Sequence, residues 1–358
     1  MRHLIQRCAQ WGNIMKRTLI SGILAVGLTS STALADTPLM DAFSDLLGSC
    51  WAYSGEPRAD EIYSADEQAP NDEIYCFERM ENHFVRIRRQ APGPHGGAFY
   101  NEEILHWNAA TQEIITVMFT SFLSWGHINY NDGAIEDGIA TIYSHENETD
   151  GPTSRYHWSA VEGDQVSRVT EQALGEESDT WGSPRTRTFT RQPASVGSEL
   201  AARMTGSPSF SPATDLFQPL LGACWSSGFD HSDAVDTHCF TDLMGRYVRD
   251  RHIIPGNPAY GGETFFFYDT EYESVEFYYY NSIGGISDGS NVHAADGIAY
   301  DSENYRGPDG DNRTFRGRYE DISYDGYTSV TEELQGDDWV EVSRQVFFRT
   351  NDNPFDTN

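Results

Sequence analysis

Two pairs of arginines carry the clearest candidate chemistry in this sequence. Arg86 and Arg88 stand two residues apart in a largely apolar stretch, and Arg249 and Arg251 repeat the arrangement later in the chain. Because successive side chains of a β-strand point to opposite faces, each pair would share one face of its strand. A buried guanidinium needs an anionic partner, which is either a protein carboxylate or a group on a ligand. If these faces line an interior, they predict an anion site.

Two glutamates at matching places are the candidate partners within the chain. Glu171 and Glu332 follow Val-Thr in both copies of a repeated pattern, and each is expected to neutralise one arginine. One cation per copy would then remain for a ligand carboxylate or sulfate. The predicted ligand is an amphipathic anion, such as a fatty or aromatic acid, with its head at Arg86/Arg88 or Arg249/Arg251.

The opposite orientation of these strands is also open. In that case Val85, Ile87 and Val248 point inward and the arginines lie outside, which is the commoner place for arginine. Asp250 stands where the first copy has Ile87, and this weakens the case for an apolar inner face. The sequence leaves both orientations as alternatives.

The arginines belong to two copies of one longer pattern. Leu-Leu-Gly-x-Cys-Trp occurs at 46–51 and again at 220–225, and each copy has a second cysteine just before a phenylalanine. These matching positions predict the disulfides Cys50–Cys76 and Cys224–Cys239 across neighbouring strands. A loop of about 15 residues closed in this way is worth roughly 3 kcal/mol. Without a Cys-x-x-Cys spacing, redox and zinc roles are not favoured for these thiols.

Short runs rich in Tyr, Phe, Val, Ile and Thr alternate with Gly, Asp, Asn and Pro clusters throughout the chain. This pattern predicts an all-β protein with two tandem antiparallel β-barrels of about eight to ten strands each. The expected segments are a signal peptide at 1–35, a first barrel at 36–192, a linker at 193–219, a second barrel at 220–350 and a tail at 351–358.

Composition and the start of the chain bear on location and partners. The sequence has 24 Lys+Arg against 55 Asp+Glu, a formal charge of −31, which disfavours nucleic acid and anionic membranes as partners. Residues 15–17 are Met-Lys-Arg, an apolar run follows, and Ala-Leu-Ala at 33–35 is typical of a cleavage site. We therefore expect a periplasmic or secreted protein, cleaved after Ala35, without membrane insertion.

The remaining residue types give no sign of a cofactor. The histidines show no His-x-His or His-Glu-x-x-His spacing and do not recur at equivalent places, so they are expected mostly at the surface or in loops, with no metal site. Phosphate-loop, dinucleotide-binding and nucleophile-elbow motifs are missing from the sequence. We expect neither a cofactor nor catalytic residues that such motifs would supply.

The repeated pattern resembles the calycin barrels, the lipocalin and fatty-acid-binding-protein relatives that include many exported bacterial proteins. The resemblance rests on a short helical turn, Leu-Leu-Gly-x-Cys-Trp on the first strand and an aromatic-x-Arg last strand. Lipocalins carry Gly-x-Trp, and this chain has one residue more between the two. The resemblance implies that Trp51 meets Arg191 and that Trp225 meets Arg349, where the first and last strands of each barrel pair.

The second copy is rich in aromatic residues at 265–268 and 277–280. Their spacing places rings on both faces of two strands, so one face lines the barrel and the other needs cover. The neighbouring barrel is the expected cover. An aromatic platform for sugars or lipids is the alternative.

Taken together, these features favour an exported protein that binds a small, partly apolar ligand in one or both barrels. One alternative is a calycin-type isomerase or hydrolase with Glu171 or Glu332 as the base. Another is a structural or surface-interaction protein whose barrels are filled by side chains, because an interior packed to normal density has no room for a ligand.

Overall fold

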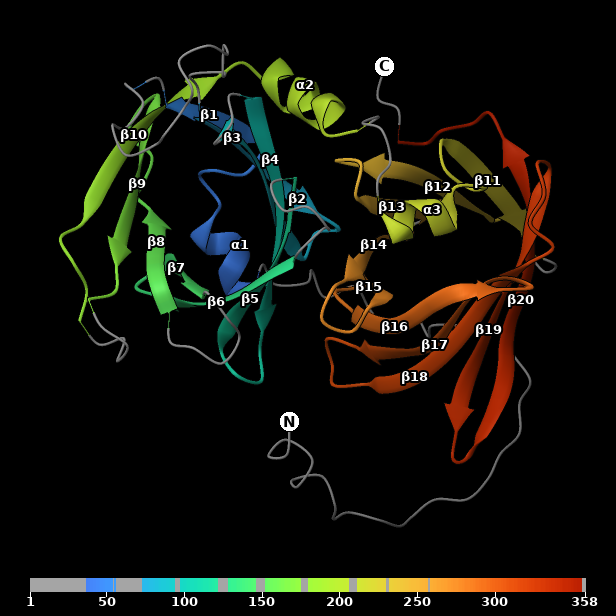
Figure 1. Ribbon diagram of the computed structural model, residues 1–358. Helices are drawn as coiled ribbons and strands as arrows, with labels where there is room; N and C mark the ends of the chain where they lie inside the picture. Colours follow the sequence, from blue (N-terminus) through green and yellow to red (C-terminus); the bar gives the residue numbers. More distant parts are fainter. Residues whose placement is uncertain are drawn as a thin grey trace. The chain divides into compact units, whose positions relative to one another are not determined.

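Two closed antiparallel β-barrels of ten strands each follow one another along the chain (Figure 1). The computed structural model describes residues 37–53, 55, 73–93, 97–121, 128–145, 152–174, 180–205, 211–229, 232–256 and 258–355. The predicted all-β class and tandem barrels are confirmed. The expected signal peptide lies outside the described residues.

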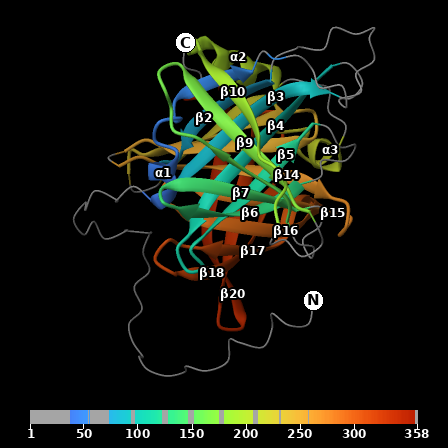
Figure 2. The ribbon, with the colours of Figure 1, turned by 90° about the vertical axis from the view of Figure 1, so that its left-hand side faces the viewer.

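The first barrel is a meander in which each strand pairs with the next and β1 closes the ring against β10. Its elements are α1 (Pro38–Ala42), β1 (Ser49–Tyr53), β2 (Glu73–Met80), β3 (Phe84–Gly93), β4 (Gly97–Asn108), β5 (Glu113–Thr120), β6 (Ile128–Glu136), β7 (Ile139–His145), β8 (Pro152–Trp158), β9 (Gln165–Gln172) and β10 (Arg185–Gln192). Figure 2 shows the strands of this barrel running obliquely, as closure of a sheet into a barrel requires.

The second barrel repeats this order, and β11 closes it against β20. Its strands are β11 (Ala223–Gly228), β12 (Val235–Leu243), β13 (Tyr247–Ile254), β14 (Tyr260–Asp269), β15 (Ser274–Asn281), β16 (Ile286–Ala295), β17 (Gly297–Arg306), β18 (Asn312–Glu320), β19 (Gly326–Gln335) and β20 (Asp338–Thr350). The connection between the barrels carries α2 (Ser195–Arg203), and α3 (Pro212–Phe217) precedes β11.

A short helix packs into the core of each barrel. Leu39 and Met40 of α1 belong to the hydrophobic core of the first barrel, and Figure 1 shows this helix inside the ring of strands. Ala213 and Phe217 of α3 take the same role in the second barrel. Of the helices described, none is long and apolar enough to cross a membrane.

The glycine of the repeated Leu-Leu-Gly pattern has a conformational role. Gly48 and Gly222 have φ of +76° and +72°, a region that strains residues with a side chain. Each amide N–H donates to a strand carbonyl, Gly48 to Phe77 at 2.8 Å and Gly222 to Phe240 at 2.9 Å. The glycine therefore turns the chain from the short helix into the first strand of each barrel.

The closing strands meet as predicted. Trp51 is paired in register with Arg191, and Trp225 with Arg349. The guanidinium carbon lies 4.4 Å from the indole centroid of Trp51 and 5.7 Å from that of Trp225. Both indoles are fully buried. Arginine stacking on tryptophan therefore accompanies closure in both barrels.

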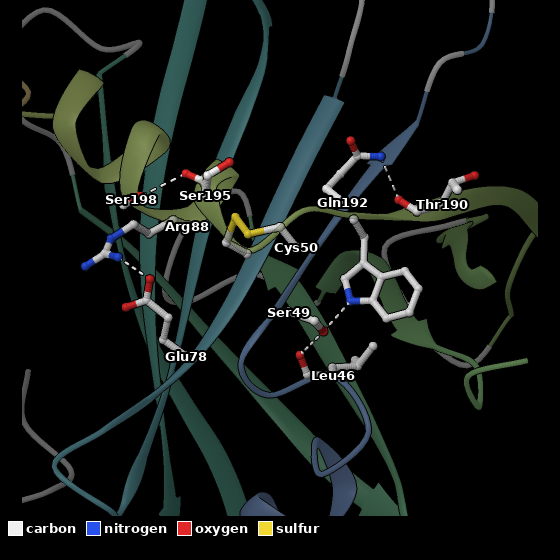
Figure 3. Close-up of a disulfide and its surroundings, with 11 residues drawn as sticks. Leu46, Ser49, Cys50, Glu78, Arg88, Thr190, Gln192, Ser195 and Ser198 are labelled. Carbon is white, nitrogen blue, oxygen red and sulfur yellow. Dashed lines mark hydrogen bonds and ion pairs between the residues drawn. A yellow bond between two sulfur atoms is a disulfide. The ribbon is translucent and has the colours of Figure 1, made fainter. Parts of the chain in front are cut away.

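Both predicted disulfides are present. Cys50 is bonded to Cys76 between β1 and β2, with 4.0 Å between their Cα atoms, and Cys224 to Cys239 between β11 and β12, at 4.1 Å. Figure 3 shows the first bridge beside α2. Cys50 and Trp51 are successive residues of β1, so their side chains point to opposite faces of the strand. Disulfides of this kind persist in oxidising compartments, which agrees with a location outside the cell.

The aromatic strands of the second barrel are covered on both faces, as expected. Phe266 and Phe277 belong to the core of that barrel. Phe265, Phe267 and Tyr280 belong to a separate cluster that also contains residues of β2 to β5. The neighbouring barrel is therefore the cover, because the two barrels bury these rings against each other.

This contact between the barrels has approximate two-fold symmetry. The ring of Phe84 lies 5.1 Å from that of Tyr280, and the ring of Tyr247 lies 5.2 Å from that of Phe119. Phe84 and Tyr247 both begin the third strand of their barrel, while Phe119 and Tyr280 occupy equivalent positions on the fifth. The contact therefore resembles the self-complementary interface of a dimer of identical subunits.

Candidate functional site

The four arginines predicted to bind a ligand lie on the outer faces of their strands. Val85 and Ile87 of β3 belong to the core of the first barrel, so Arg86 and Arg88, which alternate with them, point outward. Val248 of β13 fixes the same orientation in the second barrel. The anion hypothesis required these arginines to face the interior. That orientation is wrong, because the apolar alternation on the same strands takes the inner face.

Three of these arginines, Arg86, Arg88 and Arg249, are nevertheless buried, because they lie where the barrels meet, and Arg251 is half-buried. Arg86 and Arg249 are each 5% exposed. The Arg86 guanidinium donates from Nη2 to Glu263 Oε2 of the other barrel at 2.5 Å, and its Nε lies 3.1 Å from Glu102 Oε1. Glu102 and Glu263 are equivalent residues, since they pair in register with Arg88 and Arg251.

Glu102 is the centre of this charge network. Arg88 Nε donates to it at 3.1 Å, and Arg249 Nη1 of the other barrel lies 3.6 Å away. Burial alone would raise the pKa of Glu102, but the guanidiniums of Arg86, Arg88 and Arg249 outweigh burial and lower the pKa to about 2. Arg88 also pairs with Glu78, as Figure 3 shows. Carboxylates of the chain itself thus supply negative charge to these arginines.

Glu171 and Glu332 lie elsewhere and have other partners. Arg155 Nε donates to Glu171 at 2.7 Å, and Arg316 Nε to Glu332 at 2.8 Å. The hydrogen bond from Arg316 lowers the pKa of Glu332. A lowered pKa is opposite to what a general base working near neutral pH requires. The pairing expected between these glutamates and the four arginines is therefore not found.

Polar residues inside the first barrel form a different cluster, which sequence reasoning missed. The carboxylate of Glu73, 3% exposed, accepts from the Tyr75 hydroxyl at 2.7 Å. It also accepts from Arg89 Nη2 and from Arg187 Nη1, each at 2.5 Å. Burial would raise the pKa of Glu73, but the charges of Arg89, Arg168 and Arg187, with the Tyr75 hydrogen bond, lower it to about 2.

The guanidinium of a third arginine in this interior has fewer neutralising contacts. Arg168 lies directly opposite Arg187 on the paired strands β9 and β10. Two like charges in this position destabilise the pairing of the strands. The guanidinium carbon of Arg168 lies 4.2 Å from the centroid of the Tyr156 ring. The Nε atom of Arg168 is buried, and among the described residues it has no hydrogen-bond partner. Burial also raises the pKa of Glu103, whose carboxyl group accepts from the Tyr156 hydroxyl at 2.9 Å.

The second barrel holds histidines and aspartates at the equivalent inner positions. His238 lies with Nδ1 2.7 Å from Asp250 and Nε2 3.4 Å from Asp236. His252 lies with Nδ1 3.3 Å from Asp236 and Nε2 2.8 Å from the Tyr279 hydroxyl. The two imidazole rings stack, with centroids 4.8 Å apart. The expectation of surface or loop positions is therefore wrong for these two histidines.

The charge of this second cluster follows from its contacts. Burial would lower the pKa of His238, but the carboxylates of Asp250 and Asp236 outweigh it and raise the pKa to about 10. Burial would raise the pKa of Asp236, but the charge and hydrogen bonds of the two histidines hold it well below its usual range. The cluster thus contains a protonated imidazole between two carboxylates, inside a barrel.

A sequence signal for this cluster exists. Asp-x-His occurs twice, at 236–238 and 250–252, on what became neighbouring strands. Strand periodicity puts the aspartate and histidine of each copy on one face, and antiparallel pairing sets His238 opposite His252. Linear metal motifs do not contain this signal, because it depends on the register between two strands.

Comparison with known proteins gives no function. No protein-family model and no curated protein matches the chain. Among solved structures, the chain is similar to a protein of unknown function from the DUF3598 family of Nostoc punctiforme, at 10% identity and a TM-score of 0.19. That match covers 87% of this chain and 98% of the other.

Proposed function

We propose that this chain binds a small amphipathic anion, and that the head group of the ligand lies at Arg168 inside the first barrel. The observation that carries the proposal is the buried Nε of Arg168, which lacks a hydrogen-bond partner among the described residues. Buried polar groups without partners are rare and need an explanation. An amphipathic anion is also the ligand class that the sequence predicted. The proposed arginine, Arg168, is not one of the four that the sequence predicted.

The charge balance of this interior supports an anion. Three guanidiniums, those of Arg89, Arg168 and Arg187, face one carboxylate with a lowered pKa, Glu73, and one with a raised pKa, Glu103. These arginines are half-buried, so a surplus cation among them is less well solvated than at the surface, and an anion would stabilise it. A carboxylate or sulfate head between Arg168 and Arg187 would relieve their repulsion and accept from both guanidiniums.

The surroundings of Arg168 suit an apolar ligand body. Trp158 pairs with Arg168 in register on β8, and its buried Nε1 is a second donor without a hydrogen-bond partner in the described part of the chain. Tyr75 and Phe189 pack around the Trp158 indole, with ring centroids 4.9 and 5.2 Å from it. Rings that enclose a few convergent polar groups are typical of small-molecule sites.

We also infer that the protein is a calycin-type barrel that works outside the cytoplasm. The Trp–Arg contact at the closure of both barrels supports the first inference, since lipocalins pair the same residue types there. The two disulfides support the second.

Binding of dodecanoate, compared with dodecan-1-ol, tests the proposed function. Native mass spectrometry and titration calorimetry of the delipidated protein should show one dodecanoate per chain and a weaker complex with the alcohol. The second barrel has Ser329 where the first has Arg168, so Arg168→Ser replaces the arginine by a residue that an equivalent strand accommodates. This variant should weaken dodecanoate binding about 10- to 100-fold, the value of a charged hydrogen bond, and leave dodecan-1-ol binding unchanged.

Arg155→Ser is the matched control, because Arg155 pairs with Glu171 and stacks on Trp181, away from this cluster. It should bind dodecanoate like the wild type. Equal affinity for the acid and the alcohol, or unchanged dodecanoate binding in Arg168→Ser, would refute the anion site and favour filled barrels.

A further inference from the structure

We propose that Asp236, His238 and His252 bind one divalent transition-metal ion inside the second barrel. Each residue can offer one ligand atom, and the three atoms all lie within 4.8 Å of one another. The ligands come from two neighbouring strands, β12 and β13, so the sheet register fixes their spacing. This site is distinct from the proposed anion site in the first barrel.

Asp236 lies close to both imidazoles, with one carboxylate oxygen near each ring. Asp236 Oδ2 lies 3.4 Å from His238 Nε2, and Asp236 Oδ1 lies 3.3 Å from His252 Nδ1. Bonds of 2.0–2.1 Å in a tetrahedron place ligand atoms about 3.3–3.4 Å apart. Small side-chain adjustments would bring the three donors onto one ion, since the aspartate already lies next to both imidazoles.

Each histidine also has the outer partner that metal-bound histidines use. The second ring nitrogen of His238 contacts Asp250 Oδ2 at 2.7 Å, and that of His252 contacts the Tyr279 hydroxyl at 2.8 Å. Such partners orient the ring and leave the other nitrogen directed at the ion. The Tyr279 hydroxyl in turn lies 3.0 Å from the Tyr260 hydroxyl, which extends the hydrogen-bonded series from His252.

Charge and burial favour an ion of charge +2. Asp236 and Asp250 are 6% and 2% exposed, and Asp250 Oδ1 has no hydrogen-bond partner in the described part of the chain. The ion would displace the proton that His238 carries in the metal-free cluster. Both imidazoles would then be neutral, and two buried carboxylates would carry two negative charges, which a divalent ion balances. Two nitrogen donors and one oxygen donor favour Zn²⁺ or Fe²⁺ over Mg²⁺ and Ca²⁺. Three protein ligands leave a coordination position for water or a substrate.

The first barrel serves as an internal control. The residues equivalent to Asp236, His238 and His252 are Glu73, Tyr75 and Arg89, which include no imidazole. The proposal therefore predicts one ion per chain and not two, although the chain is a duplication.

Metal titration of the full chain tests the proposal. After treatment with a chelator, the protein should bind one Zn²⁺ with a Kd below about 1 µM, by calorimetry and native mass spectrometry. Co²⁺ in the same site should give visible absorption bands of a low-symmetry complex, and Zn²⁺ should raise the melting temperature. His252→Gln and Asp236→Asn, which keep side-chain size, should weaken Zn²⁺ binding at least about 100-fold. Asp250→Asn, which removes the negative charge of an outer partner, should weaken it about 10- to 100-fold.

His145→Gln provides the matched control, because His145 forms a His–Asp pair with Asp132 outside this cluster, at 3.0 Å. Its Zn²⁺ affinity should equal that of the wild type. Should His252→Gln fail to fold, as judged by circular dichroism, the stoichiometry and the Co²⁺ spectrum of the wild type still decide. Lack of stoichiometric Zn²⁺ or Co²⁺ binding to the folded wild type would overturn the proposal and leave an ion-paired network, as would unchanged affinity in Asp236→Asn.

Discussion

The two barrels share the residues that shape the fold but differ in the residues that line their interiors. The first barrel has Arg89, Arg168 and Arg187 on its inner face, and the equivalent residues of the second are His252, Ser329 and Gln345. Each barrel nevertheless keeps the glycine turn, the disulfide and the Trp–Arg closure. The duplication has kept the residues that build a barrel and changed those that set the chemistry inside it.

This difference underlies the two sites that we propose. An interior with surplus guanidinium charge suits an anion, whereas imidazoles with carboxylates suit a cation. Equivalent strands therefore hold opposite charge preferences on one scaffold, as expected when function depends on the site and not on the fold. Residue exchanges between the barrels are the direct way to test the comparison.

The largest effect should come from the contact between the barrels. Glu102 is fully buried and lies within 4 Å of three arginines, while its equivalent Glu263 has its shortest contact with Arg86. Glu102→Gln should reduce the free energy of unfolding by about 3–5 kcal/mol, because it leaves guanidiniums buried without their counter-charge. Glu263→Gln should cost less, since in the described part of the chain the close ion pair of Glu263 is with Arg86, while Arg249 and Arg251 act on its charge from further away. Denaturant unfolding measures the loss of stability in both variants. Equal losses would show that the two glutamates stabilise the contact equally, although their distances to the arginines differ.

A smaller effect should appear as pH dependence. His106 lies at the barrel contact, where burial, and to a lesser extent the charge of Arg306, lower its pKa to about 4 from 6.5. The folded state then binds fewer protons than the unfolded state between these values. The contribution of neutral His106 to the free energy of unfolding is therefore complete above pH 6.5. As the pH falls from 6.5 toward 4, the free energy of unfolding decreases by about 1–3 kcal/mol.

The second barrel supplies the matched exchange for this test, because Phe267 is the equivalent of His106. His106→Phe should remove this component of the stability curve between pH 4 and 6.5. The difference between the wild-type and variant curves isolates His106, since every other titrating group is common to both. Parallel curves over this interval would contradict the lowered pKa.

The smallest effect concerns the closing tryptophans. Trp51 Nε1 donates to Ser49 Oγ at 2.9 Å, and Ser49 Oγ donates to the Leu46 carbonyl at 2.5 Å (Figure 3). The second barrel has Ala223 in place of Ser49, and there Trp225 Nε1 donates directly to the Leu220 carbonyl at 3.3 Å.

Ser49→Ala should therefore cost only about 1 kcal/mol in thermal unfolding, because the indole can adopt the direct bond of the other barrel. Ala223→Ser, the reverse exchange, should be close to neutral. A loss above about 3 kcal/mol for Ser49→Ala would mean that the two closures are not interchangeable.

The sequence by itself determined the frame of this protein. The sequence repeat predicts two barrels, and the cysteines at matching positions predict the two disulfides. The matched Trp and Arg residues gave the closure. Aromatic residues on both faces of two strands required a cover beyond their own barrel, which the other barrel provides. These features are local or repeated, so strand periodicity and simple counting are enough to find them.

Only the tertiary structure decided which face of β3 and β13 is the interior. Both faces of these strands are buried, one by the barrel core and the other by the second barrel, so the usual contrast between a polar outer face and an apolar inner face is lost. Arg86 and Arg249 are charged and lie outside their barrels, whereas Asp250 and His252 are polar and lie inside. The inner cluster of the first barrel joins residues from strands far apart in the sequence, whereas that of the second lies on the neighbouring strands β12 and β13. Their partners therefore became apparent only once barrel closure and strand register had set them opposite one another.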